Sequence, residues 1–220
     1  MPKPSILFDL DGTLIDSTVP IYRAFKLAFR NFNKPEPKDE QIKALIGHPL
    51  SFMFSSLGAP KDEIDAFIKI YKDCYARYYL DETILLNGCA DALKNAASFA
   101  DLAVVTTKTS KYSCILLEHL GVLKYFKAVI GADDVNKLKP DPEPVFTALK
   151  ALNKSSENAF MIGDTGLDAL AAKAAKVRAL GVKCGFGKNL QEYFDEVFDD
   201  TKSALEWIKR DLKVKNEAKS

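Results

Sequence analysis

Residues Ser5–Thr13 read SILFDLDGT, an apolar, β-prone run that ends in two carboxylates and a glycine. A short, continuously apolar segment of this kind is typical of a strand buried on both faces of a parallel sheet. In open α/β sheets, ligands bind outside the carboxyl ends of the strands. The stretch therefore predicts a buried strand over Ser5–Leu10 that delivers Asp9 and Asp11 to a ligand-binding edge.

The next part of the chain, from Asp16 to Glu82, has helical rather than strand periodicity. Apolar residues recur at helical spacing near its start, where Pro20 suits a first helical turn. They recur again in an aromatic-rich stripe over Ile64–Tyr79, which we interpret as the core of a helical unit. No segment here reads as a strand, so we predict an all-helical cap domain over residues 16–87, inserted after the first strand.

After Gly88 the pattern changes to alternating helices and strands. Short apolar runs, each preceded by a helical pattern, lie at Leu102–Thr106, Phe126–Ile130, Asn158–Ile162 and Val177–Val182. Helices of this size between strands are crossover connections, which force a parallel sheet with helices on both faces. We therefore predict an α/β fold with a Rossmann-like core over residues 1–15 and 88–220. A last helix is expected at Lys202–Leu212, followed by a fraying polar tail.

The composition bounds the class of protein. Of 220 residues, 31 are Lys or Arg and 30 are Asp or Glu, giving a net charge of +1. This balance argues against a nucleic-acid or membrane binder that relies on bulk charge. Scattered cysteines without a C-x-x-C pair, no signal peptide and no membrane span favour a cytoplasmic protein. The sequence leaves open whether the protein is a monomer or a homodimer.

Several predicted strands end in side chains that can do chemistry. They are Asp9 and Asp11 after the first strand, Thr106 and Thr107 after the second, and Asp164 and Asp168 after the fourth, with Lys139 in a KPDP loop. Period-two alternation would put Asp9 and Asp11 on the same side of their strand, where two carboxylates need a cation or a shared proton. Acids, hydroxyls and a lysine at one sheet edge together predict a site for a divalent metal ion and a phosphate.

Taken singly, each of these residues has a purely structural alternative. Asp before Gly is usually a turn residue, Thr106 and Asp164 could cap helices, and Lys139 could be an exposed loop lysine. A calcium-binding loop counted from Asp9 is excluded, because its required glycine position holds Leu14. The convergence of all these groups on one edge favours the catalytic interpretation.

These segments resemble, in order, the four motifs of the haloacid dehalogenase superfamily of phosphohydrolases. DLDGTL at Asp9–Leu14, and GDTGLD at Gly163–Asp168 following KPDP at Lys139–Pro142, carry the resemblance. The helical insertion is similar to the helical cap of that superfamily, so the likeness covers nearly the whole chain. The sequence looks most like the phosphoglycolate-phosphatase-like branch.

The resemblance implies roles for the acids. Asp9 would be the nucleophile that forms an aspartyl-phosphate, and Asp11 would be the general acid and then the general base. Magnesium is the implied cofactor, held by an Asp9 oxygen, the Asp11 main-chain carbonyl and Asp164. Asp168 would lie behind these ligands and orient water or Lys139.

The resemblance also implies the phosphate-binding groups. These would be Thr106, the N–H of Thr107 and Lys139, which offset the charge that develops during phosphoryl transfer. Members of the branch often have Thr-Asn-Lys in this second motif, whereas this chain has Thr106-Thr107-Lys108. The change removes no catalytic group, but it weakens any assignment to one named substrate.

In the cap, the segment Gly47–Pro49 is the best candidate for a substrate-facing loop. Its His48 could contact the substrate, with a surface or helix-end histidine as the structural alternative. Arg23 and Arg77 could bind a substrate carboxylate, or could lie on solvated helix faces.

The expected function is a magnesium-dependent phosphatase acting on a small phosphorylated metabolite, with 2-phosphoglycolate as the first candidate. A nucleotide phosphatase and an inorganic pyrophosphatase of the same branch are the alternatives. From another class, the chain could be a signalling module that keeps its phosphoaspartate, or an inactive scaffold. Asp11 argues against both the signalling module and a dehalogenase, because it supplies the acid and base of ester hydrolysis.

Overall fold

The computed structural model describes residues 3–217 and divides into two compact units. One unit contains the chain up to Leu14 and from Leu85 onward, and the other contains Ile15–Ile84. We call them the core unit and the helical unit. Across the described residues, no helix has both the length and the apolar character needed to cross a membrane.

The core unit is built on a six-stranded sheet in the order β5-β4-β1-β6-β7-β8, in which every neighbouring pair is parallel. The strands are β1 (Ser5–Phe8), β4 (Asp101–Val105), β5 (Phe126–Ile130), β6 (Ala159–Gly163), β7 (Arg178–Val182) and β8 (Glu196–Phe198). β1 lies between β4 and β6, with Leu7 opposite Ala103 and Met161. The predicted parallel α/β fold is confirmed.

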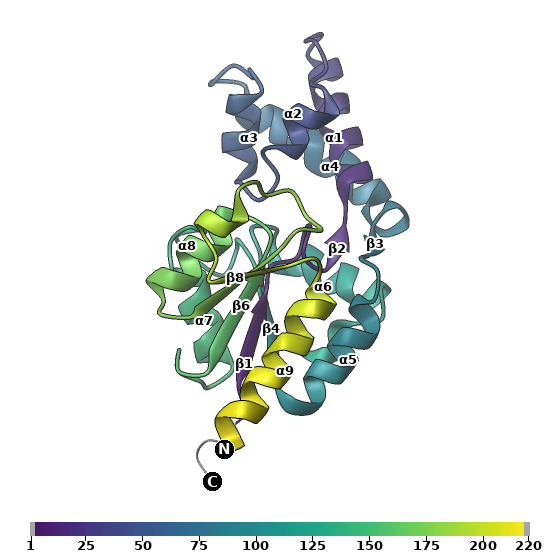
Figure 1. Ribbon diagram of the computed structural model, residues 1–220. Coiled ribbons are helices and arrows are strands. Elements are labelled where there is room, and N and C mark those ends of the chain that lie inside the picture. Colours follow the sequence, from purple (N-terminus) through teal and green to yellow (C-terminus); the bar gives the residue numbers. More distant parts are fainter. Residues whose placement is uncertain (1–2, 218–220) are drawn as a thin grey trace. The chain divides into compact units, whose positions relative to one another are not determined.

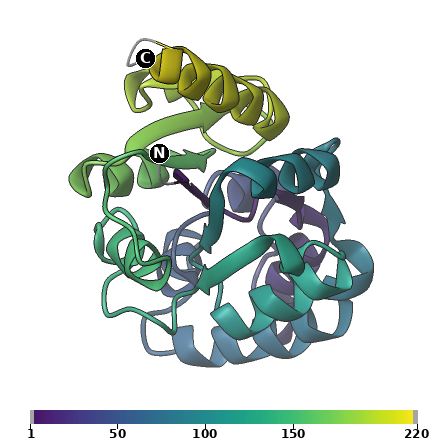
Figure 2. The same cartoon turned by 90° about the horizontal axis from the view of Figure 1, so that it is seen from below.

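Helices cover both faces of this sheet. They are α5 (Cys89–Phe99), α6 (Ser110–His119), α7 (Glu143–Ala151), α8 (Gly166–Ala174) and α9 (Thr201–Glu217), with short 3-10 helices η1 (Leu123–Tyr125) and η2 (Leu190–Glu192). α7 and α8 lie on one face, and α5, α6 and α9 lie on the other (Figure 1). Figure 2 shows α9, in yellow, lying over the green strands of the last third of the chain.

Strand alternation explains how one strand contributes side chains to the hydrophobic cores on both faces of the sheet. Leu7 belongs to a buried cluster with Val145 and Ala148 of α7 and with alanines of α8. Its neighbours Ile6 and Phe8 are fully buried too, and alternation turns them to the opposite face. A strand buried on both faces needs a continuous apolar run, which is what the sequence SILF provides.

Three features of the core unit differ from the sequence-based predictions. β1 ends at Phe8, so Asp9 and Asp11 lie in the following loop rather than on the strand. Strand β8 was not predicted, because its three residues are too few to show a period. Of the polar tail predicted to fray, residues 213–217 continue α9, because Lys and Glu are good helix formers, and residues 218–220 lie outside the described part of the chain.

The helical unit contains α1 (Thr18–Asn31), α2 (Asp39–Lys43), α3 (Leu50–Ser56) and α4 (Ile64–Glu82). Its core is aromatic: the ring of Phe25 lies 4.5 Å from that of Phe54 and 4.8 Å from that of Tyr71. Phe67 from the predicted stripe is fully buried in the same core. The aromatic residues therefore hold α1, α3 and α4 together.

The prediction that this segment has no strand was wrong at its two ends. β2 (Ile15–Asp16) and β3 (Ile84–Leu85) pair into a small two-stranded sheet where the chain enters and leaves the helical unit. Two residues per strand carry no readable alternation. The pairing depends on backbone hydrogen bonds that bring together distant parts of the chain.

Candidate active site

Lys139 lies at the centre of the polar groups at the carboxyl edge of the sheet. Its ammonium donates hydrogen bonds to Oδ1 of Asp9 at 2.6 Å, to Oδ1 of Asp168 at 2.6 Å and to the carbonyl of Val105 at 3.0 Å. An ammonium has three N–H donors, so this set satisfies it. Lys139 is 5% exposed, which excludes the alternative of a solvated loop lysine.

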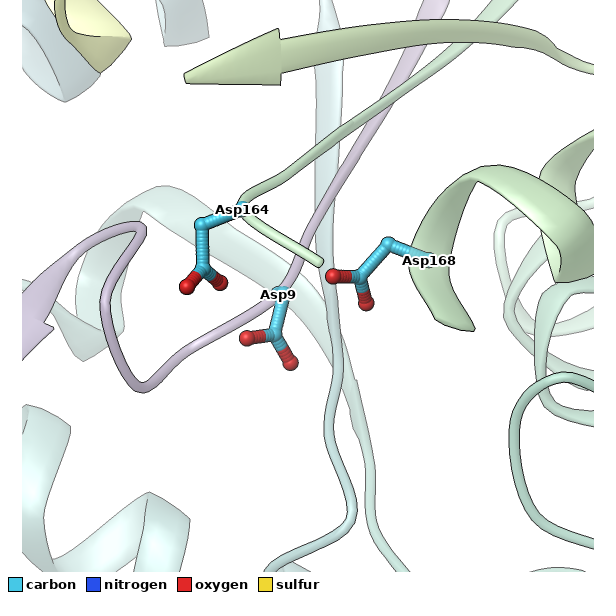
Figure 3. Close-up of side chains that lie close together, drawn as sticks. All are labelled: Asp9, Asp164 and Asp168. Atoms are coloured by element: carbon cyan, nitrogen blue, oxygen red, sulfur yellow. The ribbon is translucent and has the colours of Figure 1, made fainter. Parts of the chain in front are cut away.

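Three carboxylates converge at this edge of the sheet (Figure 3), and two of them accept the hydrogen bonds from Lys139. Asp9 follows β1, Asp164 follows β6, and Asp168 lies in the first turn of α8; one oxygen of each lies within 4.8 Å of the others. All three residues are buried, and Asp164 is fully so. A cluster of carboxylate oxygens is a donor set that Mg²⁺ prefers. These residues therefore fit a divalent cation.

The pKa values of these carboxyl groups show that the cluster carries more negative than positive charge. Burial raises the pKa of Asp9 to about 7; Lys139 opposes this rise, and the charges of Asp168 and Asp11 add to it. Burial, with the charges of Asp9 and Asp168, also raises the pKa of Asp164 well above its usual range. One buried lysine does not balance three buried carboxylates. A second positive charge would favour the ionised forms of Asp9 and Asp164.

Asp168 is held by contacts on both of its carboxylate oxygens. Oδ1 accepts the bond from Lys139, and Oδ2 accepts bonds from the backbone N–H of Thr165 at 3.0 Å and from its hydroxyl at 2.7 Å. The Thr165 pair forms a capping box at the start of α8. Gly163 permits this arrangement, since a Cβ there would lie 2.4 Å from the Cβ of Asp168. The structure thus places Asp168 against Lys139.

A loop that sequence reasoning missed holds Asp164. Its Oδ2 accepts a 2.7 Å hydrogen bond from the N–H of Phe186, and its Oδ1 accepts one of 3.2 Å from the hydroxyl of Thr13. A Cβ at Gly185 would lie 2.1 Å from Oδ2, and one at Gly187 would lie 1.9 Å from the Asp164 carbonyl. The available signal was Gly-Phe-Gly at residues 185–187, separated by two residues from the end of the apolar strand β7.

Asp11 does not belong to the three-carboxylate cluster. Strand alternation, the expected reason for Asp9 and Asp11 to lie together, does not apply, because β1 ends before both residues. Oδ2 of Asp11 lies 3.4 Å from Nζ of Lys108, and both side chains are 13% exposed. Asp11 is near enough for its charge to raise the pKa of Asp9, but its partner is a lysine from the segment after β4.

Thr106 and Thr107 follow β4 directly. Thr106 is buried; its hydroxyl accepts a 3.1 Å hydrogen bond from the N–H of Lys108, and its own N–H donates to the carbonyl of Ile130 at 2.9 Å. Thr107 is half-buried. Val105, which binds Lys139, directly precedes Thr106, so this segment and the lysine lie at the same sheet edge.

The other candidates lie in the helical unit. The ring of His48 stacks on Phe52 with 4.5 Å between centroids, and partial burial lowers its pKa. The guanidinium of Arg23 binds Glu82 at 2.5 Å and lies 4.6 Å from the ring centroid of Tyr78. Arg23 is therefore engaged within its own unit.

Comparisons with known proteins agree with the geometry. A family model described as haloacid dehalogenase-like hydrolase matches residues 6–182. A phosphoglycolate phosphatase from Colwellia psychrerythraea is 30% identical over 220 residues, covering 92% of this chain and 95% of that protein. A protein assigned as pyrophosphatase PpaX from Clostridium perfringens is 34% identical over 180 residues, covering 81% and 83%. Among solved structures, a haloacid dehalogenase-like family hydrolase from Streptococcus pneumoniae has a TM-score of 0.86 at 28% identity, covering 93% and 98%.

Proposed function

The chain belongs to the haloacid dehalogenase-like hydrolase family and is a phosphatase, and from this premise we propose that it hydrolyses a small phosphate monoester through an aspartyl-phosphate on Asp9. The observation that carries the proposal is the buried cluster of Asp9, Asp164 and Asp168 around Lys139 at the carboxyl edge of the sheet. Burying this many charged groups lowers the stability of the fold, and clusters of this kind are concentrated at functional sites.

The first step is assigned to Asp9. Lys139 binds its Oδ1, which leaves Oδ2 as the attacking atom. The bond from this oxygen to phosphorus forms as the bond from phosphorus to the ester oxygen breaks. Asp9 must be ionised for the attack, and Lys139 favours that form by opposing the rise of the Asp9 pKa.

Proton transfer is assigned to Asp11. Its carboxyl gives a proton to the departing alcohol oxygen, and then takes one from the water that attacks phosphorus. That second attack breaks the bond between phosphorus and Asp9 and regenerates the enzyme. Asp11 suits the role because it is less buried than Asp9 and lies outside the three-carboxylate cluster, where a proton can be exchanged with solvent.

Mg²⁺ is the proposed cofactor, and its proposed ligands are an oxygen of Asp9, one of Asp164 and the main-chain carbonyl of Asp11. When bound, it neutralises charge on the carboxylates and on the phosphoryl oxygens. Asp168 belongs to the same cluster, but Lys139 and Thr165 occupy its two oxygens. We therefore assign Asp168 to positioning Lys139 rather than to the metal.

The phosphoryl oxygens are assigned to Thr106, the N–H of Thr107 and Lys139. Because the ammonium already has three acceptors, it binds phosphate by exchanging one of them for a phosphoryl oxygen. The Val105 carbonyl is the partner to exchange, since it carries no charge and its bond is the longest of the three.

The substrate is proposed to be 2-phosphoglycolate, in line with the name of the Colwellia relative. Pyrophosphate is the second candidate, because the Clostridium relative is assigned as a pyrophosphatase. We propose residues 16–87 as a cap that sets this choice, with His48 facing the substrate. Its stacked ring and lowered pKa favour a neutral imidazole that donates or accepts a hydrogen bond.

Phosphate release from a panel of esters, measured with and without Mg²⁺, tests the proposal. The panel contains 2-phosphoglycolate, sugar phosphates, nucleotides and pyrophosphate. We expect Mg²⁺-dependent release with a preference for 2-phosphoglycolate, and none from Asp9→Asn. The matched control is Asp199→Asn, an exposed acid paired with Lys183, which should retain full activity. No release from any ester by the folded, Mg²⁺-supplied protein would instead favour a signalling module or an inactive scaffold.

A further inference from the structure

Side chains outside the motif segments hold the backbone at Gly12 and Thr13. The carbonyl of Thr13 accepts a hydrogen bond from the Thr201 hydroxyl at 2.5 Å and a weaker one from the Cys89 thiol at 3.9 Å. The preceding carbonyl, of Gly12, accepts from the Cys184 thiol at 3.5 Å. These donors come from α9, from α5 and from the loop after β7, so three separate elements fix this turn.

The same turn bears directly on Asp164. The hydroxyl of Thr13 donates to Oδ1 of Asp164, and Thr13 is fully buried. Gly12 packs against the same carboxylate so closely that a Cβ would lie 2.6 Å from Oδ2. The orientation of the Asp164 carboxylate therefore depends on where the backbone at Gly12 and Thr13 is held.

Thr201 is the strongest of the donors. It is 1% exposed, and its bond of 2.5 Å to the Thr13 carbonyl is short even for a hydroxyl donor. The Thr201 hydroxyl is not needed to begin α9, because Asp200 caps that helix. Oδ1 of Asp200 accepts a hydrogen bond from the N–H of Ser203, and the carbonyl of Asp200 accepts one from the N–H of Ala204. A role in helix capping therefore does not explain Thr201.

We propose that Thr201 is a positioning residue for the metal ligand Asp164, acting through Thr13. Its hydroxyl holds the Thr13 peptide, the Thr13 side chain then holds Oδ1, and the carboxylate presents its remaining lone pairs to the cation. Groups that orient metal ligands in this way contribute strongly to metal affinity. The inference rests on the proposed function, because it assumes that Asp164 binds Mg²⁺.

The test compares Mg²⁺ affinity by isothermal titration calorimetry, and the rise in Tm on adding Mg²⁺, in four forms of the full chain. Thr201→Val removes the hydroxyl at nearly constant volume and should weaken Mg²⁺ binding roughly tenfold. Thr201→Ser keeps the hydroxyl and should stay within about twofold of wild type. Thr147→Val is the matched control, since it removes a threonine hydroxyl that binds a backbone carbonyl at 2.9 Å in α7.

A double-mutant cycle tests whether Thr201 affects Mg²⁺ affinity through Thr13 or through a general loss of structural order. Thr13→Val removes the hydroxyl that binds Asp164, so adding Thr201→Val should weaken Mg²⁺ binding by no more than about a further twofold. If the two losses multiply instead, Thr201 does not act through Thr13 and the inference is overturned. Should Thr201→Val fail to fold, Thr201→Ala also removes the hydroxyl, and wild-type Mg²⁺ affinity in that variant would contradict the inference.

The outcomes distinguish the two proposals. A wild-type chain that neither binds Mg²⁺ nor needs it for phosphate release contradicts the proposed function. A wild-type chain that binds Mg²⁺, together with a Thr201→Val variant of equal affinity, leaves the function intact and overturns the role of Thr201. A lower Tm in Thr201→Val without weaker Mg²⁺ binding has the same meaning, since it shows a structural role only.

Discussion

The ammonium of Lys139 lies 2.6 Å from Oδ1 of Asp9, and both side chains are almost completely buried. The same ammonium lies 2.6 Å from Oδ1 of Asp168, so one lysine pairs with Asp9, the proposed nucleophile, and links it to the first turn of α8. Burial would lower the pKa of Lys139, but the two carboxylates outweigh it and raise that pKa. The lysine therefore stays charged at neutral pH.

Replacing Lys139 by Met should abolish phosphate release and destabilise the fold. The change leaves buried carboxylates without their cation, and breaking a buried ion pair in this way costs about 3–5 kcal/mol of unfolding free energy. Urea denaturation monitored by circular dichroism measures the loss. Lys183→Met breaks an exposed pair with Asp199 and serves as the control, for which we expect no measurable change. Equal stability of the two variants would contradict the central role of Lys139.

Asp11→Asn should trap the covalent intermediate. With an aryl phosphate as substrate, the leaving group needs no proton from Asp11, so attack by Asp9 still forms the phosphoaspartate, while its hydrolysis, which lacks the carboxylate that activates water, slows by roughly 100-fold or more. Mass spectrometry of the intact chain after brief exposure to substrate and Mg²⁺ should show one added phosphoryl group. Asp9→Asn should show none. An adduct of equal yield in both variants would place the nucleophile elsewhere.

Stability without metal should depend on pH in the direction opposite to that of an ordinary salt-bridged acid. The pKa of Asp9 is about 7 in the folded chain, against 3.8 for an ordinary Asp. Between about pH 4 and pH 7 the folded chain therefore binds more protons than the unfolded chain, and the free energy of unfolding falls as pH rises. Thermal unfolding in a chelator across this range measures the slope.

Mg²⁺ should reverse that dependence, because it favours the ionised carboxylates. The rise in Tm on adding Mg²⁺ should therefore be larger at pH 8 than at pH 5. Asp164→Asn, which removes one proposed ligand, should reduce this rise at both pH values. A rise in Tm that does not change with pH would show that the ion binds away from the titrating cluster.

Gly185→Ala should impair the site without straining the backbone. A Cβ at this position would lie 2.1 Å from Oδ2 of Asp164, so the carboxylate must move. We expect Mg²⁺ affinity to fall roughly tenfold, as for other changes to the groups around a metal ligand.

Gly121→Ala provides the contrast to that variant. Gly121 has a φ of +72° and no atom within 4 Å of an added Cβ, so alanine there costs roughly 1–2 kcal/mol of stability through backbone strain. Its Mg²⁺ affinity should equal that of wild type. Calorimetric titration of both variants makes the comparison, and a reversed order would contradict the steric role of Gly185.

The sequence predicted the sheet and its acids well, because both depend on local patterns. An apolar run such as SILF defines a buried strand, and the parallel topology then brings Asp9 and Asp164 to the same edge. The strand β8 and the pairing of β2 with β3 were missed because each segment is too short to show alternation. Their formation depends on neighbours supplied by the rest of the fold.

Contacts between distant residues escaped sequence reasoning for a similar reason. The bond from Thr201 to Thr13 joins positions 188 residues apart, and nothing in either local sequence marks it. The pairing of Asp11 with Lys108 depends on where β1 ends, and a single residue of error at that boundary changes which side chains meet. Boundaries are the least certain part of any reading of sequence.

One backbone hydrogen bond joins the two segments of the core unit between which the helical unit is inserted. The N–H of Leu86 donates to the carbonyl of Leu14 at 2.9 Å, directly beside β2 and β3. The helical unit is thus a single insertion in the core unit, and this hydrogen bond joins the chain segments on either side of it. Such an insertion can be lengthened, shortened or exchanged during evolution without altering the strand register that aligns Asp9 with Asp164. With the proposed role of residues 16–87 in substrate choice, new substrates would be acquired by changing the insertion, while the residues at the sheet edge stay as they are.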